Sequence, residues 1–163
     1  GAVRVESEPG RGTWFRLLFP CVSGSAVAIE KTIARPREWR GSGTILVVDD
    51  EKAVRDLLGN ALTKCGLSVI MANDGRQAVE RFREHAPQIA AVVLDLTMPG
   101  IGGFEAFVEM RKIRPDARII LSSGYSAVEV TARFEGKAVD GFLQKPYEPE
   151  ALIQKLRELL EEQ

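Results

Sequence analysis

Long apolar runs, paired cysteines and an excess of either charge are all missing from this 163-residue chain. No apolar run approaches the ~18 residues that a membrane-spanning helix needs. No charged-then-apolar signal peptide opens the sequence, so we expect a cytoplasmic protein whose own residues make no membrane contact. With 22 basic and 23 acidic residues the net charge is −1, which provides no global field for nucleic acid. We therefore expect no nucleic-acid partner.

Cysteine is scarce as well. Cys21 and Cys65 lie far apart in sequence without CxxC spacing, which argues against a disulfide framework or a zinc site. Cys65 falls on an apolar helical face, where a buried structural thiol is the expected role. Hydrophobic residues make up 45% of the chain and charged residues 28%, which is typical of a globular protein. The length allows one ordinary domain and some additional sequence.

From residue 44 onward, short apolar runs alternate with amphipathic segments. The apolar runs cover residues 45–50, 67–72, 89–94, 118–122 and 141–144. Helical periodicity follows at residues 52–65, 75–85, 104–113, 127–134 and 149–161. Five strand and helix alternations predict an α/β fold, a doubly wound five-stranded parallel sheet with helices on both faces. In such sheets the chemistry lies beyond the carboxyl ends of the strands.

Polar side chains stand at the ends of four of these strands. They are Asp49 with Asp50, then Asp95, then Ser122 with Ser123, and finally Lys145. In the doubly wound order 2-1-3-4-5 these groups would converge on one cleft. Three carboxylates repel one another unless a cation or a proton intervenes, and oxygen ligands favour Mg²⁺. A metal, an ammonium and a hydroxyl around one carboxylate suit phosphoryl transfer, with Asp95 as the nucleophile.

Other interpretations of these residues stay open at this point. Asp49 or Asp50 taken singly could be a helix cap, and Lys145 could be a solvated surface lysine. Composition does not choose between Ser122 and Ser123 for the hydroxyl role. A phosphatase of the haloacid-dehalogenase type also uses a strand-end Asp with Mg²⁺, but it needs a second Asp where this chain has Thr97.

Residues 44–163 resemble the receiver domain of two-component response regulators. The matching motifs are VVDDE, LDLTMPGIGG, LSSGY and QKP, at the first, third, fourth and fifth strands. The resemblance implies a flavodoxin-like sheet and makes Asp95 the phosphoacceptor. It makes Asp50, Asp95 and the Thr97 backbone carbonyl ligands of Mg²⁺, with Asp49 acting through water. Mn²⁺ is an alternative ion.

The same resemblance assigns the remaining roles. Lys145 would pair with the phosphoryl group, through a cis bond to Pro146. The sequence separations from Asp95 and Lys145 select Ser123 as the switch hydroxyl, followed by the small Gly124. Phe142 occupies the position of the rotating aromatic residue, and because it lacks a hydroxyl it would switch by packing alone. Gly102 stands where the family commonly has Asp or Ser.

Residues 3–20, VRVESEPGRGTWFRLLFP, predict two short strands around a Pro-Gly-Arg-Gly turn. The string SEPGRGTWFRLLFP resembles the last conserved box of the ATP-binding domain of sensor histidine kinases, with Gly10, Gly12 and Thr13 in its Gly-x-Gly-Thr element. The earlier nucleotide-binding boxes are absent. We therefore interpret residues 1–20 as the C-terminal remnant of that domain, unable to bind ATP.

The Ser-, Gly- and Pro-rich residues 21–43 predict a linker between this hairpin and the receiver domain at 44–163. Trp39 in the linker could dock on a domain surface or remain exposed.

The expected function is a Mg²⁺-dependent phosphoacceptor that takes a phosphoryl group from a phosphohistidine onto Asp95 and switches conformation. The chain would be part of a hybrid sensor histidine kinase, whose other regions could carry a membrane anchor. The alternative is a stand-alone single-domain response regulator. Expected partners are a kinase phosphohistidine domain or a histidine phosphotransfer protein, and the receiver face or the hairpin could support a dimer. Whether to class the chain as an enzyme stays open, because a receiver catalyses only its own phosphorylation and dephosphorylation.

Overall fold

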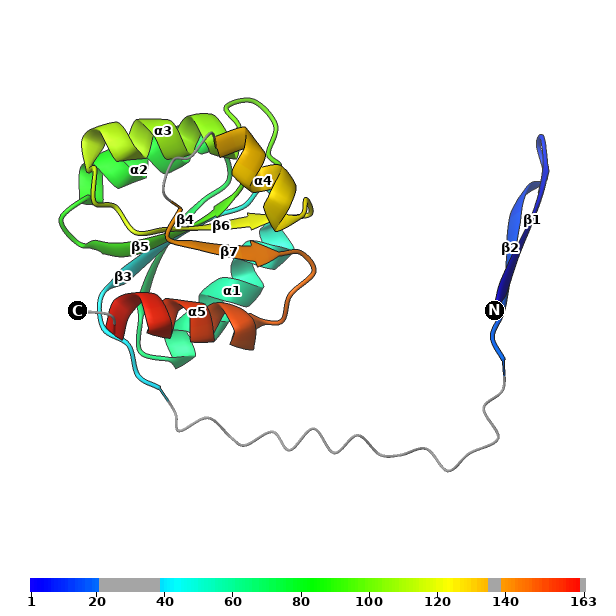
Figure 1. Ribbon diagram of the computed structural model, residues 1–163, viewed down its shortest axis with the longest axis horizontal. Coiled ribbons are helices and arrows are strands. Elements are labelled where there is room, and N and C mark those ends of the chain that lie inside the picture. The colour runs from blue at the N-terminus through cyan, green and yellow to red at the C-terminus, as the bar shows by residue number, and fades with distance from the viewer. Residues whose placement is uncertain (21–38, 135–138, 162–163) are drawn as a thin grey trace. The chain divides into compact units, whose positions relative to one another are not determined.

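A five-stranded parallel sheet covered by helices on both faces forms the larger unit in the computed structural model of this chain (Figure 1). The structure describes residues 1–20, 39–134 and 139–161. The chain divides into two compact units, Gly1–Arg35 and Pro36–Gln163, which we describe separately. Most of the expected linker, together with Cys21, lies outside the described residues.

The strand order of the sheet is β4-β3-β5-β6-β7, which confirms the doubly wound order expected from the sequence. All neighbouring strands run parallel. The strands are β3 (Thr44–Val48), β4 (Ser68–Ala72), β5 (Ile89–Asp95), β6 (Ile119–Ser123) and β7 (Gly141–Gln144). The order reverses between β3 and β5, so the carboxyl ends of these two strands mark the point where a site is expected.

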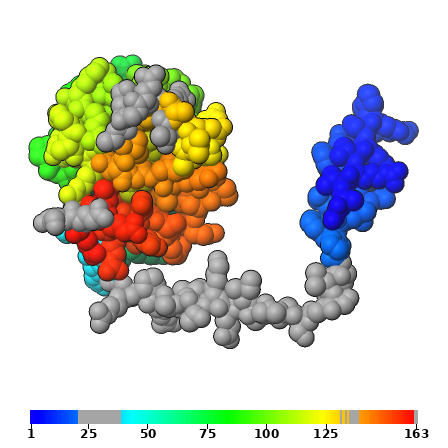
Figure 2. Space-filling view, viewed as in Figure 1, coloured from blue at the N-terminus to red at the C-terminus, as the bar shows by residue number. Residues whose placement is uncertain are grey.

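Two apolar clusters, one on each face of the sheet, hold the helices in place. The helices are α1 (Lys52–Lys64), α2 (Gly75–His85), α3 (Gly103–Ile113), α4 (Ala127–Phe134) and α5 (Pro149–Glu161). Helices α1 and α5 pack on one face around Leu58, Leu62 and Leu156. Helices α2, α3 and α4 cover the other face, where Phe107 meets Phe134 edge-on (Figure 1). In Figure 2, the surfaces of α4 (yellow), β7 with its following loop (orange) and α5 (red) lie on one face of this unit.

Helix α4, with eight residues, is the shortest of the five, and a capping box at its start stabilises it. The backbone N–H of Ser126 donates to the Glu129 carboxylate at 2.8 Å, and the Ser126 hydroxyl donates to the same oxygen at 2.7 Å. The N–H of Glu129 in turn donates to the Ser126 hydroxyl at 3.4 Å. These reciprocal bonds satisfy backbone donors that a helix start otherwise leaves unpaired.

Trp39 packs against the core of the larger unit. Its ring lies half-buried beside the apolar cluster under α1 and α5, and the N–H of Gly41 donates to the carbonyl of Cys65 at 3.0 Å. Of the two alternatives for Trp39, the structure shows docking. Cys65 is a free thiol that is half-buried and not fully buried as the sequence predicted, and burial raises its pKa.

The smaller unit contains the hairpin expected from the sequence, formed by β1 (Ala2–Glu8) and β2 (Gly12–Leu18). The strands pair antiparallel, and the turn uses Gly10 and Gly12 with φ of 80° and 97°, where a side chain would be strained. One face carries Val3, Val5, Phe15 and Leu17, all more than half exposed. None of the helices that the structure describes is both long and apolar enough to cross a membrane.

Candidate functional site

Three carboxylates meet where β3 and β5 end, as the sequence predicted. Asp49 and Asp50 follow β3 directly, and Asp95 is the last residue of β5. One oxygen from each of the three lies within 4.8 Å of the others. Asp49 and Asp95 are buried, whereas Asp50 is exposed at the mouth of the site. The cluster therefore combines two fixed carboxylates with one that faces solvent.

Lys145 connects the two buried carboxylates. Its ammonium donates to Asp95 Oδ2 at 2.7 Å and to Asp49 Oδ2 at 2.8 Å. Burial alone would lower the pKa of Lys145, but the hydrogen bonds to the two carboxylates outweigh it and raise the pKa. The ammonium is therefore a fixed positive charge within the acidic cluster.

Asp95 is held by a donor on each oxygen. Oδ1 accepts the backbone N–H of Thr97 at 2.9 Å, while Oδ2 accepts Lys145. Burial raises the pKa of the Asp95 carboxyl, and the two hydrogen bonds counteract that rise only in part. The carboxylate is thus poorly solvated and held in one orientation by its two donors, which is an environment that activates a carboxylate nucleophile.

Asp49 is fixed by the start of α1. Its Oδ1 accepts the backbone N–H of Glu51, the N-cap residue of α1, at 2.9 Å. The capping alternative raised from the sequence is wrong for Asp49, because α1 has no side-chain cap hydrogen bond. The guanidinium of Arg55 donates to the Asp49 backbone carbonyl at 2.6 Å. Sequence reasoning missed Arg55, which looks like any polar residue on an amphipathic helix.

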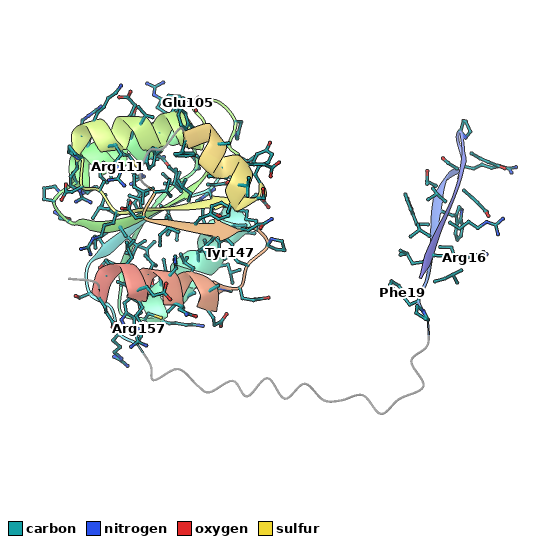
Figure 3. All side chains as sticks on the ribbon, in the orientation of Figure 1. Arg16, Phe19, Glu105, Arg111, Tyr147 and Arg157 are labelled. Atoms are coloured by element: carbon teal, nitrogen blue, oxygen red, sulfur yellow. The ribbon has the colours of Figure 1, made fainter. Side chains whose placement is uncertain are left out.

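The two serines at the end of β6 have different partners. The Ser123 hydroxyl, fully buried, accepts the backbone N–H of Tyr125 at 3.1 Å. The Ser122 hydroxyl donates to the phenolic oxygen of Tyr147 at 3.1 Å. Tyr147 lies in the loop between β7 and α5 (Figure 3). Nothing in the sequence singled out Tyr147, because its hydrogen-bond partner could be identified only in three dimensions.

The remaining predicted residues lie around this cluster. Phe142 is half-buried in β7 and packs against the apolar cluster beneath α4. The peptide bond between Lys145 and Pro146 is cis, as the sequence led us to expect. Thr97 is exposed in the loop after β5, and its N–H is the group that contacts Asp95.

A close backbone approach shapes the loop that follows Asp95. A Cβ added to Gly103, the first residue of α3, would lie 2.1 Å from the carbonyl oxygen of Asp95. Any side chain there would displace the loop or the strand end. Gly103 is therefore part of the construction of the site, although it carries no chemistry.

A comparison with protein families matches residues 45–157 to the response regulator receiver domain. Sensor kinase CckA of Brucella abortus is 33% identical over 170 residues, a match that covers all of this chain but 18% of that protein. The chain thus spans less than a fifth of this relative. Chemotaxis protein CheY of Thermotoga maritima is 36% identical over 118 residues, covering 71% of this chain and 95% of CheY.

Solved structures agree with the sequence matches. The structure of response regulator protein TrrA from Thermotoga maritima in complex with Mg²⁺ and a beryllium fluoride superposes with a TM-score of 0.64. The two are 36% identical, and the match covers 72% of this chain and 99% of TrrA.

Proposed function

We propose that this chain, which belongs to the response regulator receiver domain family, accepts a phosphoryl group on Asp95 in two-component signalling. The observation that carries the proposal is the contact between Asp95 and Lys145. A buried carboxylate within 2.7 Å of a permanent cation, beside two further carboxylates, combines a nucleophile with groups that stabilise a phosphoryl group.

The donor set fits Mg²⁺. Asp49, Asp50 and Asp95 offer oxygen ligands within 4.8 Å of one another, and two of them are rigidly held. Hard oxygen ligands that fill only part of a coordination shell are typical of Mg²⁺ sites, and Mn²⁺ has similar preferences. The Thr97 carbonyl completes the proposed protein ligands, with Asp49 acting through water. Bound Mg²⁺ would supply positive charge to the oxygens of the incoming phosphoryl group.

The chain's own residues would act as follows. An oxygen of Asp95 attacks the phosphorus of a phosphohistidine in line, and the bond from phosphorus to the histidine nitrogen breaks. The electron pair of that bond returns to the imidazole. Lys145, released from its contact with Asp95, neutralises the transferred phosphoryl group. Hydrolysis of the aspartyl phosphate by water returns Asp95 to its carboxylate form.

The proposed conformational change begins at Ser123. Its hydroxyl would leave the N–H of Tyr125 to donate to a phosphoryl oxygen. The space it vacates would admit the ring of Phe142, which now packs among apolar neighbours under α4. The surface over α4, β7 and α5 would change as a result.

We also propose that the chain is part of a hybrid sensor histidine kinase, with residues 1–20 as the remnant of the ATP-binding domain. Two observations support this: the match to sensor kinase CckA extends over the whole chain, and the hairpin has the exposed apolar face expected of a piece without its parent sheet. The phosphoryl donor would then be the kinase's phosphohistidine domain or a phosphotransfer protein. The alternative is a stand-alone regulator, which is compatible with the match to CheY, but that match covers 95% of CheY and 71% of this chain.

Acetyl phosphate with Mg²⁺ tests the central step. We expect modification at Asp95, detected by mass spectrometry, and none in Asp95→Asn. Asp116→Asn, which alters an exposed acid between α3 and β6, is the matched control and should react like the wild type. Beryllofluoride with Mg²⁺ should shift the NMR amide signals of Ser123 and Phe142. Unchanged signals there, with Asp95 modified, would contradict the proposed switch.

A further inference from the structure

Three consecutive residues after β7, Lys145, Pro146 and Tyr147, form a short hook that β6 holds at both ends. At the first end, the N–H of Lys145 donates to the carbonyl of Ser123 at 2.8 Å. At the other end, the hydroxyl of Ser122 donates to the phenolic oxygen of Tyr147 at 3.1 Å. The residue that bears the ammonium is thus held between two consecutive residues of the neighbouring strand.

Ser122 is also tied to the strand that carries the proposed phosphoacceptor. It lies opposite Asp95 in the pairing of β5 with β6, and its carbonyl accepts the N–H of Leu96 at 3.0 Å. Its side chain is 2% exposed. Ser122 therefore connects the backbone around Asp95 to the side chain of Tyr147.

The position of a lysine ammonium depends on what holds the backbone from which the side chain extends. Lysine has a flexible four-carbon stem, so the Lys145 ammonium could leave either carboxylate if the hook shifted. We propose that Tyr147 is a positioning residue, whose hydrogen bond with Ser122 fixes the hook and thereby places the Lys145 ammonium on Asp95. This inference rests on the proposed function and deepens it.

The hydroxyl of Tyr147 has a role distinct from that of its ring. The half-buried ring packs against the apolar cluster under α1 and α5, and phenylalanine could fill that space equally well. The hydroxyl instead meets a buried serine, and a buried polar group that loses its partner is strongly unfavourable. The hydrogen bond between Ser122 and Tyr147 therefore fixes the direction of the Tyr147 side chain. Packing of the ring alone would let the side chain slide.

The test compares the wild type with Tyr147→Phe, which removes only the hydroxyl. At saturating Mg²⁺ we expect phosphorylation by acetyl phosphate to slow about tenfold, because small displacements of a charge-stabilising group cost rate steeply. The Mg²⁺ dissociation constant, followed by NMR at the amides of Asp50 and Thr97, should not rise, since β3 and β5 place the carboxylates. If Tyr147 contributed only to general stability, Tyr147→Phe would slow phosphorylation and also raise the Mg²⁺ dissociation constant.

Three further variants complete the experiment. Ser122→Ala should slow the reaction to a similar extent, and adding it to Tyr147→Phe should cause little further loss, because both remove the same bond. Thr63→Val removes a hydroxyl bond to the carbonyl of Gly59 in α1 and should leave the rate unchanged.

Three results would overturn the inference: an unchanged rate in Tyr147→Phe, additive losses in the double variant, or an equal loss in Thr63→Val. Should Tyr147→Phe fail to fold, Ser122→Ala alone decides by the same two measurements. A wild-type protein that acetyl phosphate does not modify at Asp95 would refute the proposed function itself, and the inference with it.

Discussion

The carboxylate of Asp95 and the ammonium of Lys145, fifty positions apart in sequence, lie 2.7 Å apart. The parallel sheet brings them together, since β5 and β7 both end at the same edge with only β6 between them. The same ammonium also donates a hydrogen bond of 2.8 Å to the carboxylate of Asp49. One lysine thus offsets the repulsion between two buried acids.

Replacing Lys145 should affect chemistry far more than it affects the fold. Lys145→Gln removes the charge that would neutralise the phosphoryl group, and we expect phosphorylation by acetyl phosphate to slow about 10²-fold. Lys155→Gln removes a lysine of α5 whose partner, Glu158, is on the surface, and it should react at the wild-type rate. Equal rates for the two variants would show that Lys145 has no role in transfer.

The raised pKa of Asp95 predicts that this acid lowers stability at neutral pH. Between its ordinary pKa and the raised value, the folded protein binds more protons at Asp95 than the unfolded chain does, so the free energy of unfolding falls as pH rises through that interval. In metal-free solution Asp95→Asn should therefore have a higher melting temperature than the wild type at pH 7. The difference should shrink as pH falls through the raised pKa.

Thermal unfolding over a range of pH values measures this difference. Asp116→Asn provides the baseline for replacing an exposed acid. If the difference in melting temperature between Asp95→Asn and the wild type were the same at all pH values, titration of Asp95 would not be its cause.

Much of the site could be predicted because its side chains stand at the ends of strands, and apolar runs in the sequence show where strands end. The five apolar runs locate the strands to within a residue or two, and the doubly wound order then brings Asp49, Asp95 and Lys145 to one edge. Ser122 and Ser123 illustrate the limit. They are adjacent in sequence, both are buried, and only the structure shows that one meets Tyr147 and the other the N–H of Tyr125.

Contacts that depend on the path of a loop could not be predicted either, because the sequence does not show which groups a loop brings together. Three of the four consecutive residues 100–103 are glycines. Nothing in the sequence indicates that Gly103, of the three, lies against the carbonyl of Asp95. Trp39 stands in a segment whose composition is that of a linker, yet it docks on the core. In both cases the contact depends on the path of the backbone between the two partners, which the residue types alone do not specify.

Neighbouring glycines at the start of α3 should respond in opposite ways to substitution. Gly103→Ala places a Cβ against the Asp95 carbonyl and should lower the free energy of unfolding by about 2 kcal/mol or more. Gly102 is the N-cap, with extended backbone and no capping side chain. Gly102→Ser would form a capping box with Glu105 and should raise the free energy of unfolding by about 0.5 kcal/mol.

Urea unfolding of the two variants distinguishes these effects. The same experiments with Mg²⁺ present should show weaker ligand stabilisation in Gly103→Ala, because displacement of the loop also moves Asp95. Stability of Gly103→Ala equal to that of the wild type would show that the loop relaxes without cost.

The two tryptophans of the chain provide a test of the Trp39 contact. Trp39→Ala removes a half-buried ring from the cluster beneath α1 and α5 and should lower the free energy of unfolding of the larger unit by about 1–3 kcal/mol. Trp14→Ala removes a hairpin ring that is 77% exposed and should change it by less than about 0.5 kcal/mol. Urea unfolding followed by far-ultraviolet circular dichroism measures both, and Trp39 fluorescence in Trp14→Ala should shift to longer wavelength as the larger unit unfolds. Equal stabilities of the two variants would mean that the ring of Trp39 contributes no net packing energy, and that the core of the larger unit is complete without it.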